Sequence, residues 1–272
     1  MEKNKFFLIV LIFIFLANGL LSQNRSFPYE INKKDLWLLP LGIVLSEYGD
    51  YLSDNFDLIT YDEVSRLDRN DVNAFDRSAT YNWSLKWDER SDQYRDILVL
   101  STLLAISIPP VFHAKLSETV TVAGMLVESY FLLKGVTYLT KTTVGRERPY
   151  LYNTSMSIDE RYFMGGEDAS FSFFSGHTAA AFTAATFLSK IMTDIHGHSV
   201  WTKLLWGSSL TLAALTGYAR YEAGMHFPSD VIAGAAVGFA IGYLIPTLHK
   251  KNKNKPVSLS ISPDRISLRL GF

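Results

Sequence analysis

The chain has 272 residues, a formal net charge of −1 and no cysteine. The near-neutral charge argues against a nucleic-acid partner, and the lack of cysteine excludes thiol catalysis, zinc–thiolate sites and disulfides. The chain is 48% hydrophobic with a mean hydropathy of +0.09. These values are high for a soluble enzyme and low for a densely membrane-embedded protein.

The first predicted element is a secretory signal. A short basic start, MEKNK, is followed by the apolar run FFLIVLIFIFLANGLL and the polar stretch SQNRS, which is the order of a signal sequence. We expect residues 1–22 to be a signal peptide cleaved near Ser22 or Gln23, with an uncleaved membrane anchor as the alternative. In either case, the chain from Gln23 onward starts outside the cytoplasm.

Residues 23–96 are predicted to form an extracytoplasmic N-terminal region. Residues 36–46, LWLLPLGIVLS, are shorter than the roughly 20 residues that a span needs and contain Pro40, so we expect an interfacial or core-packing helix. Residues 51–96 are rich in Asp, Arg, Asn and Ser, and they predict a polar insertion with short helices. Asp76, Arg77 and the charged groups of residues 87–90 could reach a ligand, but we expect them on a solvated surface.

Five apolar segments near span length follow, and they predict an all-α, membrane-embedded bundle of five to six core helices over residues 97–250. Charged residues inside several segments leave open a buried bundle outside the bilayer. The segments cover about residues 97–113, 118–140, 176–194, 201–218 and 229–248.

The two sides of the membrane can be assigned from charge. The last apolar segment ends in HKKNKNK, and the positive-inside rule places such an end in the cytoplasm. We therefore expect the opposite helix ends on the periplasmic side of a bacterial-type inner membrane. Residues 251–272 are predicted to form a basic tail and a possible β-hairpin around Pro263 and Asp264.

The polar residues at the predicted outer helix ends indicate an anion site. The three cationic side chains, Lys141, Arg148 and Arg220, imply a multiply charged anion. The planar guanidinium group of arginine matches the geometry of phosphate. Ser175 can cap its helix and leave the amides of Gly176 and His177 directed at the anion. The set lies in KTTVGRERP, FSGH and RYEAGMHFPSD and consists of Lys141, Arg148, Ser175, Gly176, His177, Arg220, His226 and Asp230.

The two histidines of this set suggest a division of labour. His226 and Asp230 are four residues apart, so the carboxylate can hold one ring nitrogen protonated and orient the other. His226 is therefore a candidate nucleophile. His177, beside the anion, is a candidate to deliver a proton to a leaving oxygen.

These three blocks resemble the signature of the type 2 phosphatidic acid phosphatase and vanadium haloperoxidase superfamily, Lys-x6-Arg-Pro, Pro-Ser-Gly-His and Ser-Arg-x5-His-x3-Asp. The resemblance covers about residues 97–248, with Phe174 and Ala219 replacing the family's usual proline and serine. It implies that His226 forms a phosphohistidine, that Asp230 supports it and that His177 is the general acid. It also implies phosphate binding by Lys141, Arg148, Ser175, Gly176 and Arg220.

The resemblance implies hydrolysis of a lipid phosphate or diphosphate at the membrane, without a metal or other cofactor. Phosphatidic acid, phosphatidylglycerol phosphate, polyprenyl diphosphate and lipid A phosphate are the expected substrates. A vanadate-dependent haloperoxidase that uses the same pocket, or a non-catalytic membrane protein, is the alternative.

Two further groups of residues are considered for other roles. His196 and His198 in HGH, with Asp194 nearby, suggest a metal pair, but we interpret them as ordinary loop histidines because no further ligand is evident. Glu128 and Lys134 lie within an apolar segment and are expected to pair with other helices or to face a cavity.

Overall fold

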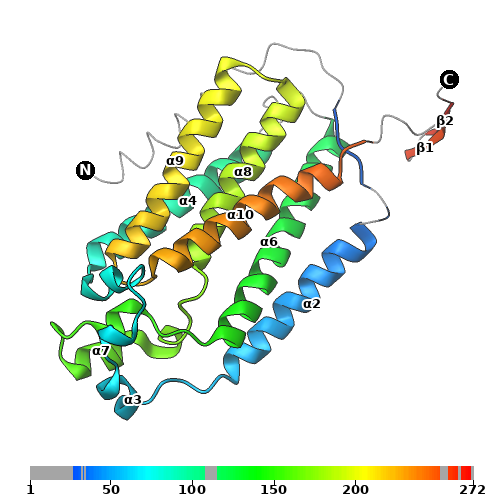
Figure 1. Ribbon diagram of the computed structural model, residues 1–272. Coiled ribbons are helices and arrows are strands. Elements are labelled where there is room, and N and C mark those ends of the chain that lie inside the picture. The colour runs from blue at the N-terminus through cyan, green and yellow to red at the C-terminus, as the bar shows by residue number, and fades with distance from the viewer. Residues whose placement is uncertain are drawn as a thin grey trace.

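The computed structural model describes residues 27–31, 33, 35–107, 115–251, 257–262 and 265–270. The predicted signal peptide lies outside these residues. Six long helices form one bundle (Figure 1), which confirms the predicted all-α fold. They are α2 (Asp35–Asp54), α4 (Leu85–Ser107), α6 (Leu116–Val144), α8 (Gly176–His196), α9 (Val200–Glu222) and α10 (Pro228–Leu248).

The helix predicted at residues 36–46 is present and packs on α6, but it is longer than predicted, because α2 has twenty residues and continues through Pro40. Proline costs the helix one hydrogen bond, and close packing on α6 offsets this cost. A Cβ atom added to Gly42 would lie 3.1 Å from the Leu132 nitrogen, and one added to Gly135 would lie 2.6 Å from Leu45 Cβ. Glycines therefore let the backbones of α2 and α6 approach along their lengths.

Helix α2 runs from one end of the bundle to the other. Its first residue, Asp35, lies 2.8 Å from His249 at the end of α10, while the Phe56 ring just beyond α2 packs 4.9 Å from that of Phe171. The segment before α2 pairs with the chain after α10, where the Glu30 N–H donates to the His249 carbonyl at 2.9 Å. The predicted extracytoplasmic start and the predicted cytoplasmic lysine end therefore lie together, although we had expected them on opposite sides.

A ladder of three glycines brings α10 against α8. Cβ atoms added to Gly234, Gly238 and Gly242 would lie 2.2–2.6 Å from carbonyl oxygens of α8 or of its N-cap residue. No side chain other than hydrogen fits at these distances. The ladder therefore fixes the start of α8 beside the start of α10, which is where the predicted anion site lies.

The polar insertion is shorter than predicted, because α4 begins at Leu85 and takes in residues 85–96. Its short helices lie at the end of the bundle where α8 and α10 begin (Figure 1). They are α3 (Tyr61–Arg66), η1 (Arg69–Asp71) and η2 (Arg77–Tyr81), joined there by η3 (Pro149–Tyr152), α7 (Ile158–Gly165) and η4 (Gly166–Asp168).

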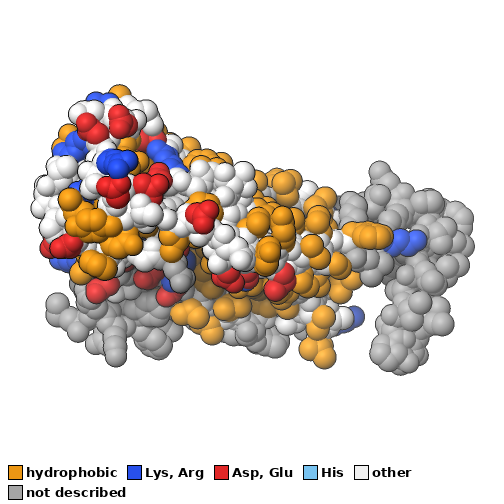
Figure 2. All heavy atoms as spheres, turned by 90° about the horizontal axis from the view of Figure 1, so that it is seen from below, with side chains coloured by type: hydrophobic (Ala, Val, Ile, Leu, Met, Phe, Trp, Pro, Cys, Tyr) orange, Lys and Arg blue, Asp and Glu red, His pale blue; other side chains and the backbone are white. Residues whose placement is uncertain are grey.

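The surface divides into a charged end and an apolar flank. Figure 2 shows most of the Asp, Glu, Lys and Arg side chains of that face gathered over the end with α3 and α7, and many apolar side chains farther along it. Trp37, Val44, Val120 and Ile232 are among the exposed apolar residues. Within the described residues, two helices are long and apolar enough to cross a membrane, the one beginning at Leu116 and α10.

The C-terminal hairpin that the sequence predicts is present. Strands β1 (Val257–Ser262) and β2 (Arg265–Leu270) pair antiparallel, with Val257 opposite Leu270 and Ser262 opposite Arg265. The hairpin lies at the opposite end of the molecule from α3 and α7 (Figure 1).

Candidate active site

The structure brings the three predicted sequence blocks together at one end of the bundle. A cavity of about 250 Å³ is lined by Arg148, His177 and Arg220, which come from three different blocks or helices. Lys141, in the last turn of α6, lies beside them, since a Cβ added to Gly176 would be 4.0 Å from its Nζ. Cationic and imidazole groups far apart in the sequence therefore share one small space.

The start of α8 is built as predicted for an anion seat. Ser175 is the N-cap residue, and its side chain accepts a hydrogen bond from the Thr178 N–H at 3.4 Å. The Ser175 N–H donates to the Asp230 carbonyl at 3.1 Å, which ties the cap to α10. The cap leaves the amides of the first turn, including those of Gly176 and His177, available to a bound anion.

The two arginines are buried and held by oxygen atoms. Arg148 is 5% exposed, and its Nε donates to the Asp168 carbonyl at 2.7 Å. Arg220 is 4% exposed, forms an ion pair with Asp88 and donates to Ser91 Oγ at 3.2 Å. Such restraint holds both guanidinium groups in the cavity wall, where they need little reorganisation to meet an anion.

Three carboxylates line the same cavity, and they are acidic partners for the cations and for His177 that the sequence analysis did not identify. Asp88 pairs with Arg220, Asp92 lies 2.8 Å from His177 Nε2, and Asp168 lies 3.6 Å from Arg148. Asp88 and Asp92 belong to the first turns of α4. The prediction that residues 87–90 form a solvated surface is therefore wrong at Asp88, because α4 turns that side chain into the site.

His226 is 1% exposed and has a defined tautomer. Its Nδ1 lies 2.7 Å from the Ser172 carbonyl oxygen, so Nδ1 carries the proton and Nε2 has the free lone pair. Burial lowers the pKa of His226 well below its ordinary value, and the positive charges of Arg148 and Arg220 lower it further. A neutral imidazole with an unprotonated Nε2 is the form required of a nucleophile.

Asp230 lies near His226 but has other partners. Its Oδ2 is 3.8 Å from His226 Nδ1, while it accepts hydrogen bonds from Ser172 Oγ at 2.6 Å and from the Phe227 N–H at 2.9 Å. The ring nitrogen is thus held directly by the Ser172 backbone. Asp230 fixes the positions of Ser172 and the turn before α10, and it supports His226 through them.

The sequence analysis missed a buried network behind Asp230. Arg146 bridges Asp230 at 2.5 Å and Asp76 at 2.9 Å, and Asp76 accepts hydrogen bonds from the Ser229 N–H and hydroxyl. Asp76 is only 2% exposed, so its predicted place on a solvated surface is wrong. Burial raises the pKa of Asp76, but hydrogen bonds from Asn73, Ser229 and Arg146 outweigh it and hold the pKa below the ordinary value.

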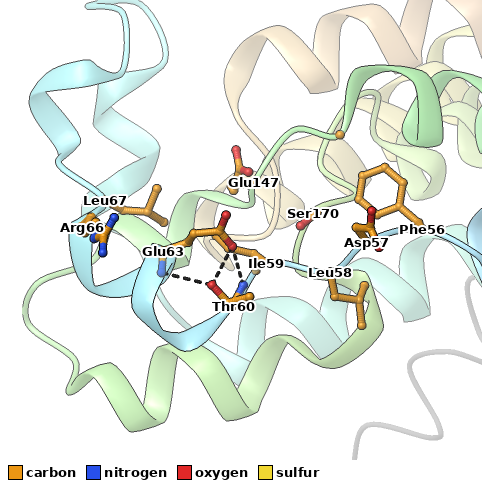
Figure 3. Close-up of a pocket in the computed structure, with 11 residues that line it drawn as sticks. Phe56, Asp57, Leu58, Ile59, Thr60, Glu63, Arg66, Leu67, Glu147 and Ser170 are labelled. Carbon is orange, nitrogen blue, oxygen red and sulfur yellow. Dashed lines mark hydrogen bonds between the residues drawn. The ribbon is translucent and has the colours of Figure 1, made fainter.

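A second cavity of about 630 Å³ lies beside this site and shares no lining residue with it (Figure 3). Residues 56–67 form most of its wall, and Glu147 and Ser170 close the other side. Its lining has three carboxylates and one arginine but no histidine, so it lacks the groups needed for phosphoryl transfer. The smaller cavity is the better candidate for an active site despite its size.

Comparison with known proteins identifies the family of the chain. A sequence model of the PAP2 superfamily matches residues 120–254, which contain all eight predicted site residues. The chain belongs to the PAP2 superfamily.

Particular relatives resemble this chain over part of their length. A lipid A 4'-phosphatase of Porphyromonas gingivalis is 32% identical over 83 residues, which are 30% of this chain and 30% of that protein. A lipid A 1-phosphatase of the same organism is 39% identical over 70 residues, or 26% of this chain and 14% of that protein. The matched regions therefore span less than a third of these relatives.

One solved structure is also similar. It is described as the first transmembrane PAP2 type phosphatidylglycerolphosphate phosphatase from Bacillus subtilis, and it has 18% sequence identity and a TM-score of 0.47. The likeness covers 76% of this chain and 94% of that one.

Proposed function

We propose that this protein is a metal-independent phosphatase that hydrolyses a lipid phosphate or diphosphate through a phosphohistidine. The observation that carries the proposal is the meeting of Arg148, Arg220 and His177 in one cavity, with His226 buried beside them in its Nε2-free tautomer. Membership of the PAP2 superfamily supports the same reaction class.

Substrate binding begins with an exchange of partners. The incoming phosphate competes with Asp88 for Arg220 and with Asp168 for Arg148, while Lys141 and the amides at Gly176 add further positive charge. Ser175 holds these amides in place by capping α8. Fixed cations stabilise the charge on the transferring phosphoryl group, which is the main contribution to catalysis of this reaction.

The chemical steps follow from the two histidines. His226 Nε2 attacks phosphorus, a P–N bond forms and the bond from phosphorus to the leaving oxygen breaks. His177 gives its proton to that oxygen, and Asp92, 2.8 Å from His177 Nε2, orients the ring for the transfer. Water then cleaves the P–N bond, with His177 taking the proton back, and inorganic phosphate leaves.

The membrane supplies the proposed substrate. Apolar residues cover the flank of the bundle below the site (Figure 2), and two described helices have the length and composition of spans. The names of the Porphyromonas gingivalis relatives support lipid A phosphates as first candidates, beside phosphatidic acid, phosphatidylglycerol phosphate and polyprenyl diphosphate. We place the site on the periplasmic side of an inner membrane, since Lys250 and Lys251 mark the opposite end.

The test is phosphate release from these four lipids by detergent-purified protein in the presence of EDTA. Wild-type protein should release phosphate from at least one lipid, and His226→Ala should not. His198→Ala is the matched control, because His198 is an exposed loop histidine. A 32P-labelled lipid should leave an acid-labile, alkali-stable label on the wild type and none on His226→Ala.

The outcomes separate the alternatives. Release that survives in His226→Ala would disprove the phosphohistidine. If no lipid is hydrolysed and the folded protein oxidises bromide with vanadate and peroxide, the protein is a haloperoxidase. If neither reaction occurs, a non-catalytic role is the remaining interpretation.

A further inference from the structure

A second buried histidine lies at the other end of the bundle, between two carboxylates. His249 follows α10, Asp35 begins α2, and Glu128 lies within α6. His249 Nε2 is 2.8 Å from Asp35 Oδ1 and 3.2 Å from Glu128 Oε2. One nitrogen ligand and two oxygen ligands, from three helices, therefore face a common point.

The hydrogen bonding of His249 leaves Nε2 directed at this point. Its Nδ1 lies 2.8 Å from the Ile245 carbonyl oxygen one turn earlier, so Nδ1 carries the proton. This arrangement is typical of metal-binding histidines, in which a backbone carbonyl on one nitrogen fixes the tautomer that presents the other. Nε2 faces two carboxylate oxygens within 3.2 Å, so a proton or a metal ion must lie between these atoms.

Two of the three residues are buried. His249 is 2% exposed and Glu128 is 4% exposed. The buried Oε2 of Glu128 receives no hydrogen bond from the described part of the chain, although it points at His249. The neighbouring lysines do not neutralise the cluster, since Lys250 pairs with Asp194 and Lys251 donates to the Phe27 carbonyl.

We propose that Asp35, Glu128 and His249 bind a divalent transition-metal ion, with Zn²⁺ and Mn²⁺ as the best-matched ions. Their ligand atoms all lie within 4.8 Å of one another, which a small movement converts into a coordination shell. A mixed imidazole and carboxylate set suits zinc, manganese or iron, whereas Mg²⁺ and Ca²⁺ favour oxygen ligands alone.

The proposed metal would act on the fold and not on phosphate chemistry. It joins the first residue of α2, the interior of α6 and the end of α10. The 21 residues of α10 separate it from the candidate active site by about 30 Å. The inference is independent of the proposed function, and EDTA is expected to lower thermal stability while leaving the phosphate-binding groups intact.

The experiment measures bound metal in full-length protein purified through a tag that contains no histidine. The protein is stripped with EDTA, dialysed against Zn²⁺ or Mn²⁺ and analysed by elemental mass spectrometry and thermal unfolding. Wild-type protein should retain one equivalent of metal and show a higher Tm with metal than without it.

Two variants and two controls make the test specific. Glu128→Gln and His249→Gln should lose the bound metal and the metal-dependent rise in Tm. Glu47→Gln, an exposed carboxylate on α2, and His198→Gln should keep both. The proposal would be overturned if the wild type bound neither Zn²⁺ nor Mn²⁺ and showed no metal-dependent rise in Tm. It would also be overturned if His249→Gln kept the bound metal and the rise in Tm. Because Tm and metal content are read without substrate, failure of the phosphatase assay does not affect the result.

Discussion

The two ends of the bundle use a buried histidine in the same tautomer for different purposes. At one end, His226 Nδ1 donates to the Ser172 carbonyl, and the positive charges of Arg148, Arg220 and Lys141 act on the ring. At the other end, His249 Nδ1 donates to the Ile245 carbonyl, and its Nε2 faces Asp35 and Glu128. We infer from this comparison that the charge of the groups around the ring, more than the histidine itself, decides whether the site favours a bound anion or a bound cation.

The largest expected effect is that replacing His226 lowers activity, whereas replacing His249 lowers thermal stability. His226→Gln should lower kcat by at least about 10⁴-fold, because a nucleophile is lost, with little change in Tm. His249→Gln should lower Tm and leave kcat within about twofold at temperatures where it is folded. Phosphate release and thermal unfolding of both variants measure this. Equal loss of activity in both would show that the two ends are not independent.

A second prediction concerns the framework of the active-site end. Asp76→Asn removes the charge that partners Arg146 and is expected to lower the free energy of unfolding by about 3 kcal/mol, since it breaks a buried ion pair. Asp57→Asn, at an exposed position of the same insertion, should change it by less than about 0.5 kcal/mol. Denaturant titration in detergent measures both. If Asp76→Asn left the free energy of unfolding unchanged, this network would not support the site.

The pH dependence of stability provides a third test. Because the pKa of His226 is lowered in the folded protein, a proton binds to it mainly after unfolding, and it destabilises the fold as the pH falls below about 6.5. Between pH 6.5 and 5.5 the wild type should lose about 1 kcal/mol relative to His226→Gln, which does not titrate. Unfolding at several pH values checks this. Parallel curves for the two proteins would show that His226 is already protonated or solvated.

The smallest expected effect comes from the carboxylates that occupy the cations. Asp88→Asn removes a negative charge beside Arg220, so inorganic phosphate should inhibit roughly fivefold more strongly, a change of about 1 kcal/mol. Glu89→Gln, exposed on the next position of α4, is the control. The inhibition constant for phosphate is the measurement. Weaker inhibition in Asp88→Asn would show that Asp88 positions Arg220 more than it competes with phosphate.

The sequence predicted the helix ends of the candidate site better than the partners of its side chains. The helix ends at Lys141, Ser175 and Asp230 follow from apolar runs and capping residues, which are local signals. Asp88 and Asp92 were placed in a solvated insertion, because their polar neighbours hide the start of α4. Their contacts with Arg220 and His177 depend on how the helices pack, which no local pattern reveals.

Two other features differ in how well a sequence can reveal them. The spacing of Gly234, Gly238 and Gly242 is a signal for close helix packing that is visible in the sequence itself. The cluster of Asp35, Glu128 and His249 joins residues more than ninety positions apart, so no local pattern in the sequence reveals it. His196 is buried in the structure, and Asp194 is already bound by Lys190, Lys250 and Tyr29.

The end-to-end course of α2 has a consequence for how the chain is inserted. Residues 27–31 and 249–251 are hydrogen-bonded neighbours, so reporter proteins fused beside them should give the same compartment signal. If the lysines are cytoplasmic, Phe27 is cytoplasmic too, and a leader peptidase on the outer face would not release a new N-terminus near residue 23. Periplasmic catalysis and a cleaved export signal are therefore competing descriptions of this chain, and a single N-terminal sequencing run on the purified protein distinguishes them.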